Sequence, residues 1–216
     1  SLIYAGLTVF ALIALAPFVH TVARSLSAEA PIIRGEVYIW PVNFTLDGYE
    51  RLIAGGTFWL AFRNSLYITI FGTLFQMVFT ILCAYPLSRT YLPGRKFFMG
   101  LVVFQLIFPP GLVPLYLVVR EVGLIDTWAA LVVPYSLNTF HMIVLKSYLQ
   151  EMPKELEESA VIDGANDLQV LMSVVLPLAM PVLMTLTLLY AVANWNLFLP
   201  AIFFLTDGNK QPLQVI

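Results

Sequence analysis

From Met152 to Pro177 the chain reads Met-Pro-Lys-Glu-Leu-Glu-Glu-Ser-Ala-Val-Ile-Asp-Gly-Ala-Asn-Asp-Leu-Gln-Val-Leu-Met-Ser-Val-Val-Leu-Pro. Local chemistry predicts two helices in this stretch. Pro153 suits a first helical turn because its missing N–H would have no partner there, and the glutamates that follow place negative charge at the positive end of the helix dipole. Gly164 can adopt a positive φ and end this helix, and Asn166 can cap a second one.

The second predicted helix is amphipathic. Its apolar residues recur at i, i+3, i+4 and i+7, namely Leu168, Leu171, Met172 and Val175. Periodicity alone leaves open a helix pair that simply lies in the headgroup layer of a membrane. A helix that enters a cleft on a partner needs small residues and a sharp turn, which Ala160 and Gly164 provide, and an exposed carboxylate such as Glu158 can pair with cations there.

The composition around this stretch excludes an ordinary soluble domain. Hydrophobic residues make up 60% of the chain and charged residues 11%, with a mean hydropathy of +0.86. Soluble domains have roughly half their residues apolar and about a quarter charged. The net charge of −2 gives no footprint for nucleic acid, and the single cysteine, Cys83, can build neither a disulfide framework nor a metal cluster. The sequence predicts an all-α membrane protein.

Five apolar runs are long enough to cross a bilayer. A helix that rises 1.5 Å per residue needs about 20 mostly apolar residues to cross a hydrocarbon layer of about 30 Å. The runs are residues 3–22, 64–87, 97–119, 128–149 and 176–199. We expect them to form one transmembrane domain that takes in residues 1–216, with residues 150–175 as the loop between the fourth and fifth spans.

Lysine and arginine positions indicate the orientation. Arg89, Arg95 and Lys96 lie within one short loop, whereas the cations expected on the opposite side are mostly spread over the long segment 23–63. Short cytoplasmic loops carry the excess of these residues, and long loops can translocate despite their charge. We therefore expect the 88–96 loop, and with it the 150–175 loop, to be cytoplasmic.

The 158–177 segment resembles the EAA loop of ABC importer permeases, through Glu158-Ser159-Ala160, Asp163-Gly164-Ala165 and Leu176-Pro177. In that family this cytoplasmic loop forms coupling helices that dock into a cleft on the ATP-binding subunit. Serine at position 159 replaces the usual alanine, and its small size makes this a mild departure. The resemblance implies an ATPase-coupling role for Glu158, Ser159, Ala160, Asp163, Gly164, Leu176 and Pro177.

Nearly the whole chain is similar to the second permease subunit of carbohydrate importers of the maltose type. The segments that carry this likeness include residues 84–89, 123–127 and 195–196. Within that group it most resembles permeases for oligosaccharides from polyuronides, through Phe108-Pro109-Pro110-Gly111-Leu112-Val113-Pro114, Tyr190 to Asn196 and Pro212-Leu213-Gln214, although Pro110 stands where a glycine is expected.

The resemblance implies the helical bundle of a type I ABC importer permease in the bacterial inner membrane, with a sixth span after Ile216. It also implies four kinds of partner: a second homologous permease, a dimer of ATP-binding subunits that hold ATP and Mg, an extracellular solute-binding protein and an oligosaccharide substrate. The substrate is expected to be an oligosaccharide, including acidic ones from pectin- or alginate-like polysaccharides. An importer for a non-sugar solute would share the loop and differ in its cavity.

Polar residues inside the apolar runs are candidates for the substrate pathway, because such groups are costly in hydrocarbon and face the bundle or water. The candidates are Gln105, Asn138, Asn194, Trp195 and Asn196. Hydrogen bonds between helices, worth about 0.6 kcal/mol each, are the alternative role for each of them. A gating hinge is expected where the third run is broken by Pro109, Pro110, Gly111 and Pro114, since a broken helix at this depth needs protein or water around it.

The chain carries no signature of an enzyme. It has no G-x-x-x-x-G-K phosphate loop, so we expect it to bind no cofactor or metal of its own and to take its energy from an ATPase partner. A secondary transporter driven by an ion gradient is the remaining alternative. That class should show carboxylates within its spans, and none of the five runs has an aspartate or glutamate at mid-span.

Overall fold

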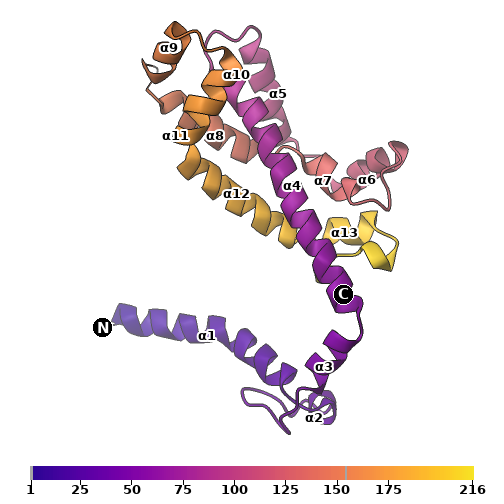
Figure 1. The fold of residues 1–216 in the computed structure, drawn as a ribbon. Coiled ribbons are helices and arrows are strands. Elements are labelled where there is room, and N and C mark those ends of the chain that lie inside the picture. The colour runs from indigo at the N-terminus through magenta and orange to yellow at the C-terminus, as the bar shows by residue number, and fades with distance from the viewer. Residues whose placement is uncertain (1, 154) are drawn as a thin grey trace. The chain divides into compact units, whose positions relative to one another are not determined.

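The computed structural model describes residues 2–153 and 155–216, and these are helical apart from loops and one isolated bridge between Ser27 and Phe44. The prediction of an all-α protein is confirmed. The chain forms two compact units, one up to Leu60 and one from Ala61 to Ile216, and Figure 1 draws the first of them in indigo to purple. The two units are described separately below.

The first unit consists of α1 (Leu2–Ser25), α2 (Glu29–Ile33) and α3 (Asp47–Ala54). The apolar side chains of α1 are exposed along nearly its whole length, as expected of a helix whose surroundings are lipid. The chain after α1 is pinned by Ser27, whose hydroxyl donates to the Ala23 carbonyl and accepts from the Val42 N–H. This contact folds the start of the long 23–63 segment back onto the end of α1.

The second unit is built around α4 (Thr57–Ser88), which begins in the first unit. The helices that follow are α5 (Arg95–Ile107), α6 (Leu112–Glu121), α7 (Ala129–Val132), α8 (Thr139–Glu151), α9 (Glu155–Ile162), α10 (Asp167–Val170), α11 (Leu176–Leu178), α12 (Met180–Trp195) and α13 (Leu199–Phe204). Shorter turns are the 3₁₀ turns Val133–Tyr135, Gly208–Lys210 and Leu213–Val215 and the π turn Leu171–Val175.

Two of the described helices, α1 and α4, are unbroken and apolar enough to cross a membrane. Three bent pairs pass the same test together, so the described residues hold up to five spans if each pair counts as one. The bends are 119° between α5 and α6, 48° between the α7 turn and α8, and 81° between α11 and α12. Each of the five apolar runs predicted from the sequence overlaps one of these five segments, although the fifth run was expected to continue to residue 199 and its segment ends at Trp195. One transmembrane domain stays a prediction.

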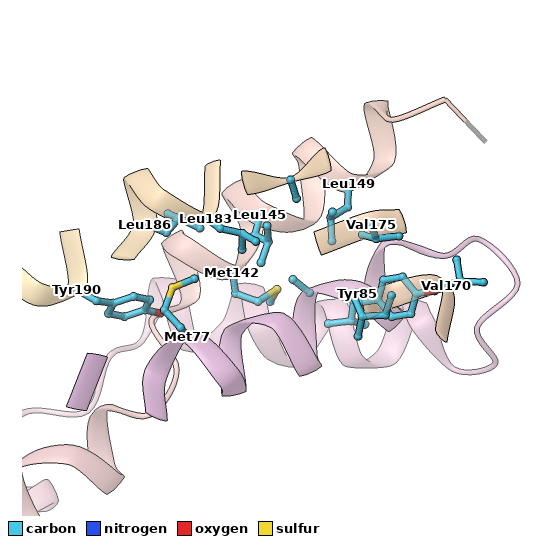
Figure 2. Close-up of a cluster of buried hydrophobic side chains, with 14 residues drawn as sticks. Met77, Tyr85, Met142, Leu145, Leu149, Val170, Val175, Leu183, Leu186 and Tyr190 are labelled. Atoms are coloured by element: carbon cyan, nitrogen blue, oxygen red, sulfur yellow. The ribbon is translucent and has the colours of Figure 1, made fainter. Parts of the chain in front are cut away.

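The largest hydrophobic cluster lies between α4, α8 and the α10–α12 segment, and Figure 2 shows its side chains. Met142, Leu145 and Val175 are fully buried at its centre. A second cluster, which includes Ile68, Leu131 and Phe204, packs α6, α7 and α13 against α4. Because α4 contributes to both clusters, it is the common support of this unit.

The start of α4 is tied to the C-terminal segment by two polar residues. Asn64 is fully buried, and its Nδ2 donates to the carbonyl oxygens of Asn209 at 2.8 Å and Gln211 at 3.0 Å. The Ser65 hydroxyl accepts from the Leu213 N–H at 2.8 Å. These contacts hold residues 209–213 against α4 at the end opposite to Ser88.

Candidate functional site

The segment that resembles the EAA loop has the turn and the cap that its sequence predicts, but Pro153 lies before α9 and the second helix is α-helical only to Val170, where the π turn begins. Gly164 lies at φ +89°, and its N–H donates to the Val161 carbonyl at 3.0 Å, so it ends α9. Asn166 caps α10 in a reciprocal arrangement with Gln169, in which each side chain accepts from the other's backbone N–H. Lys154 of this loop lies outside the described residues.

The residues assigned to coupling divide between solvent and core. Glu158, Ser159, Asp163, Gly164 and Pro177 are exposed, whereas Ala160 and Leu176 are partly buried against the large hydrophobic cluster. The loop also exposes apolar side chains, namely Leu168 and Met172 of the predicted amphipathic helix and Val161 and Ile162, which were not considered. Ile162 is 85% exposed. Such a patch beside carboxylates is typical of a surface that docks on another protein.

The predicted hinge coincides with the sharp bend between α5 and α6. Pro109 and Pro110 lie in the break, where two missing N–H groups prevent the helix from continuing. Gly111 precedes α6 with extended backbone at φ −68°, so a positive φ is not what this position requires. Pro114 lies inside the first turn of α6 and not in the break, where its missing N–H costs nothing. A hinge function for these residues stays a prediction.

A cavity of about 500 Å³ opens beside this bend. Its walls come from α4, α5, the bend, the start of α6, the turn before α8, the start of α8, and the end of α12. Three of the five candidate pathway residues line it: Gln105, Asn138 and Asn194. Trp195 and Asn196 are not among the lining residues. The Trp195 ring meets the Phe62 ring edge-on at 6.0 Å, and the Asn196 amide donates to Val192 on its own helix.

The three lining amides have partners within the protein. Asn194 Nδ2 donates to Thr73 Oγ1 at 3.1 Å and to Gln76 Oε1 at 2.8 Å. Gln105 Oε1 accepts from the Thr139 hydroxyl at 3.0 Å. Asn138 caps α8, since its Oδ1 accepts from the His141 N–H. These bonds are the interhelical contacts and caps that the structural alternative describes, and they also fix the polar atoms at the cavity wall.

Two of the other lining residues, Tyr190 and His141, contact each other, and His141 is one of the polar residues within the apolar runs. Tyr190 Oη lies 2.7 Å from Thr80 Oγ1 and accepts from the Asn138 N–H, and its ring meets that of His141 edge-on at 4.4 Å. His141 Nδ1 is buried with no hydrogen-bond partner among the described residues. The sequence held one signal for Tyr190: it is four residues before Asn194 and so shares its helix face.

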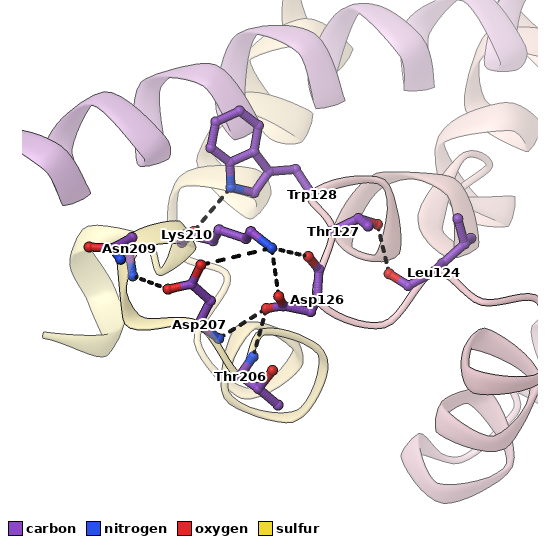
Figure 3. Close-up of polar contacts among 8 residues, drawn as sticks. All are labelled: Leu124, Asp126, Thr127, Trp128, Thr206, Asp207, Asn209 and Lys210. Carbon is purple, nitrogen blue, oxygen red and sulfur yellow. Dashed lines mark hydrogen bonds and ion pairs between the residues drawn. The ribbon is translucent and has the colours of Figure 1, made fainter.

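A second polar cluster joins the loop before α7 to the segment after α13 (Figure 3). Asp126, at φ +61°, accepts from the Thr206 and Asp207 N–H groups through Oδ1 and from Lys210 Nζ through Oδ2 at 2.6 Å. Trp128 Nε1 donates to the Lys210 carbonyl at 3.1 Å. The hydrogen bond from Lys210, followed by that from the Asp207 N–H, lowers the pKa of Asp126 from 3.8 to about 2.

The depressed pKa of Asp126 predicts how this cluster responds to acid. A carboxyl group whose folded pKa is lowered stabilises the fold above its unfolded value of 3.8, and this stabilisation is lost as the pH falls toward 2. Hydrogen exchange of residues 205–212 should therefore be constant from neutral pH down to about pH 4.5, after correction for intrinsic rates, and protection should fall below it. Asp126→Asn should lose protection at every pH.

Asp47→Asn is the matched control, because Asp47 is exposed and makes no ion pair with a described residue. It should leave exchange in residues 205–212 unchanged. Equal protection in the Asp126→Asn variant and the parent would show that the cluster does not hold this segment.

Comparison with known proteins identifies the class. Residues 76–215 match the family described as binding-protein-dependent transport system inner membrane component, and the chain belongs to this family. It is thus an inner-membrane permease subunit of an ABC transporter, and in such systems the ATPase activity lies in a partner. This confirms the family inferred from the EAA-like segment and excludes the ion-coupled alternative.

Individual relatives show which ABC transporters this chain is similar to. The chain is 40% identical to Protein LplC of Bacillus subtilis (strain 168), over 94% of this chain and 69% of the relative. It is 40% identical to the polygalacturonan/rhamnogalacturonan transport system permease protein YtcP of the same organism, over 100% and 75%. A crystal structure of a bacterial ABC transporter involved in the import of the acidic polysaccharide alginate matches with a TM-score of 0.93 and 34% identity, over 99% of this chain and 76% of that chain.

Proposed function

We propose that this chain is a permease subunit of an ATP-driven, binding-protein-dependent importer of oligosaccharides, including acidic ones released from pectin- or alginate-like polysaccharides. The observation that carries the substrate class is the likeness over the full chain to a permease named for polygalacturonan and rhamnogalacturonan. The cavity supports it, because amides and tyrosine hydroxyls along its wall are the groups that bind sugar hydroxyls.

The negative charge of an acidic substrate would be recognised outside this cavity. The residues that line the cavity include no lysine or arginine, and His141 is the one ionisable nitrogen base among them. A lining of this kind fits the neutral parts of a sugar chain. The carboxylates of an acidic oligosaccharide would be recognised mainly by the binding protein and by the second permease subunit.

The 150–175 loop is proposed as the cytoplasmic coupling element. Its exposed carboxylates and apolar side chains would dock on an ATP-binding subunit, of which a dimer holds ATP and Mg. In this orientation the Asp126–Lys210 cluster lies on the extracellular side, where the binding protein delivers the solute. Closure of the ATPase dimer would draw the loops together and turn the cavity outward.

Transport by the complete complex tests this proposal. The chain is co-expressed with its second permease and ATPase, reconstituted into proteoliposomes, and supplied with its binding protein and labelled oligosaccharides. Uptake of oligogalacturonate should require ATP and the binding protein and should exceed uptake of neutral oligosaccharides of equal length. Uptake of amino acids but of neither sugar class would overturn the substrate assignment and favour the non-sugar importer.

A further inference from the structure

One ion pair in the second unit is shielded from solvent. Arg89 Nη1 lies 2.8 Å from Glu157 Oε2, and the two side chains are only 11% and 15% exposed. The other ion pairs of the described residues join side chains that are at least 30% exposed. Arg89 directly follows α4, and Glu157 lies in the first turn of α9, so the pair connects the long support helix with the helix of the EAA-like segment.

The surroundings of this pair indicate a positional role more than a stabilising one. The guanidinium lies over the Tyr85 ring at 4.5 Å, which fixes its plane. Yet Arg89 Nε and Nη2 and Glu157 Oε1 have no hydrogen-bond partner among the described residues. Because the attraction within a buried ion pair often does no more than offset its desolvation cost, the pair is weak evidence for net stability.

The pair is the polar tie between α9 and the end of α4. No residue of α9 is buried, and the described side chains of α9 make no other hydrogen bond or ion pair to α4 or its following loop. By contrast, the end of α4 is bound to α8 through Gln150 and to α10 through Tyr85. A cavity of about 570 Å³ beside the pair leaves α9 little other packing on this side.

Helix geometry separates the roles of the two adjacent glutamates. Consecutive residues point about 100° apart around a helix, so Glu157 can face Arg89 while Glu158 faces solvent. A force that a partner applies to the exposed face of α9 would therefore reach α4 through Glu157 and Arg89. At 1.5 Å per residue α4 extends for about 48 Å. It carries Gln76 to the cavity wall and Asn64 to the far end.

We propose that Arg89 and Glu157 are positioning residues that transmit movement of α9 to α4 and so couple ATP hydrolysis to the opening of the cavity. This inference rests on the proposed coupling function of the 150–175 loop. Neither residue contacts ATP or sugar in this arrangement. Together they fix the direction of α9 relative to the end of α4.

The test measures ATP hydrolysed per sugar imported in proteoliposomes that contain the full complex. Glu157→Gln, which leaves the Arg89 charge buried without a partner, should raise this ratio by roughly tenfold. The double variant Arg89→Met/Glu157→Met removes both charges, so it should regain the thermal stability and assembly of the parent. Its ratio should stay raised, because two flexible thioether chains hold no fixed direction. Arg89→Lys keeps the charge but not the planar fork and should be intermediate.

Glu155→Gln is the control, since Glu155 is exposed on the same helix and makes no ion pair with a described residue. It should leave the ratio unchanged. A parent-like ratio in both Arg89→Lys and the double methionine variant would overturn the proposal. Gly164→Pro in the same assay separates two failures. If Gly164→Pro uncouples and the Arg89 variants do not, only the positioning role is wrong; if none uncouples, the coupling function of the loop is wrong as well.

Discussion

Replacement of Gly164 with proline is expected to reduce sugar import strongly while ATP hydrolysis continues. Proline requires φ near −65° and has no N–H, whereas Gly164 lies at φ +89° and donates to Val161. The variant therefore cannot form the turn that ends α9 and sets the direction of α10. We expect the ATP hydrolysed per sugar imported to rise by roughly 10- to 100-fold, with normal insertion into the membrane.

Gly123 offers a closely matched control for this experiment. It ends α6 at φ +74°, its N–H donates to the carbonyl three residues earlier at 3.0 Å, and the space around its Cα is open, as it is at Gly164. Gly123→Pro removes the same bond and the same conformation at the other end of the unit. It should leave the ATP hydrolysed per sugar imported at the value of the parent. Normal import by Gly164→Pro would show that the α9–α10 turn does not couple the two reactions.

Replacement of Ala193 with tryptophan is expected to block the pathway. Ala193 lines the cavity of about 500 Å³ on α12, next to the buried Asn194. An aromatic side chain buries about 150–250 Å², so an indole at this position would fill much of the space that a sugar ring needs. Import should fall by roughly tenfold or more, and ATP hydrolysis should persist, because the coupling loop is unchanged.

Val192, the neighbouring residue on the same helix, provides the control for introducing a side chain as large as tryptophan. Val192 is exposed and does not line the cavity, so Val192→Trp should import sugar far better than Ala193→Trp at equal membrane levels. Binding of the labelled sugar to the detergent-solubilised complex gives a second measurement. Equal import by the two variants would exclude this cavity as the route.

The membrane segments were predictable because hydropathy over 20 residues is a local property, but of their three bends only one was predictable. The double proline at 109 and 110 marked one bend, since missing N–H groups act whatever the surroundings. The fifth apolar run was expected to begin at Leu176, next to Pro177. The structure places the bend at Ala179 instead, because Pro177 falls in the first turn of α11 after a π turn, where its missing N–H is tolerated.

In the candidate site, too, features that depend on the local sequence were predictable and features that depend on helix packing were not. The positive φ of Gly164 and the cap at Asn166 depend on neighbours within four residues, and both appear in the structure. Cavity lining depends on how each helix is rotated about its axis. Asn194, Trp195 and Asn196 are consecutive, so their side chains point about 100° apart and cannot all face one space. Tyr190 lies on the same helix face as Asn194. It was missed as a cavity-lining residue because it was considered only as part of the motif from Tyr190 to Asn196.

The buried amide of Asn64 has a consequence for how the protein is made. Its partners, Asn209 and Gln211, lie 145 and 147 residues later in the chain. At synthesis rates of about 5–20 residues per second, roughly 7 to 30 s pass between the emergence of Asn64 and that of its partners. During this interval the amide has no native hydrogen-bond acceptor. Because Asn64 lies at the end of an apolar run, water at the membrane interface can accept its hydrogen bonds instead. The start of α4 is therefore completed only after residues 209–211 have been translated.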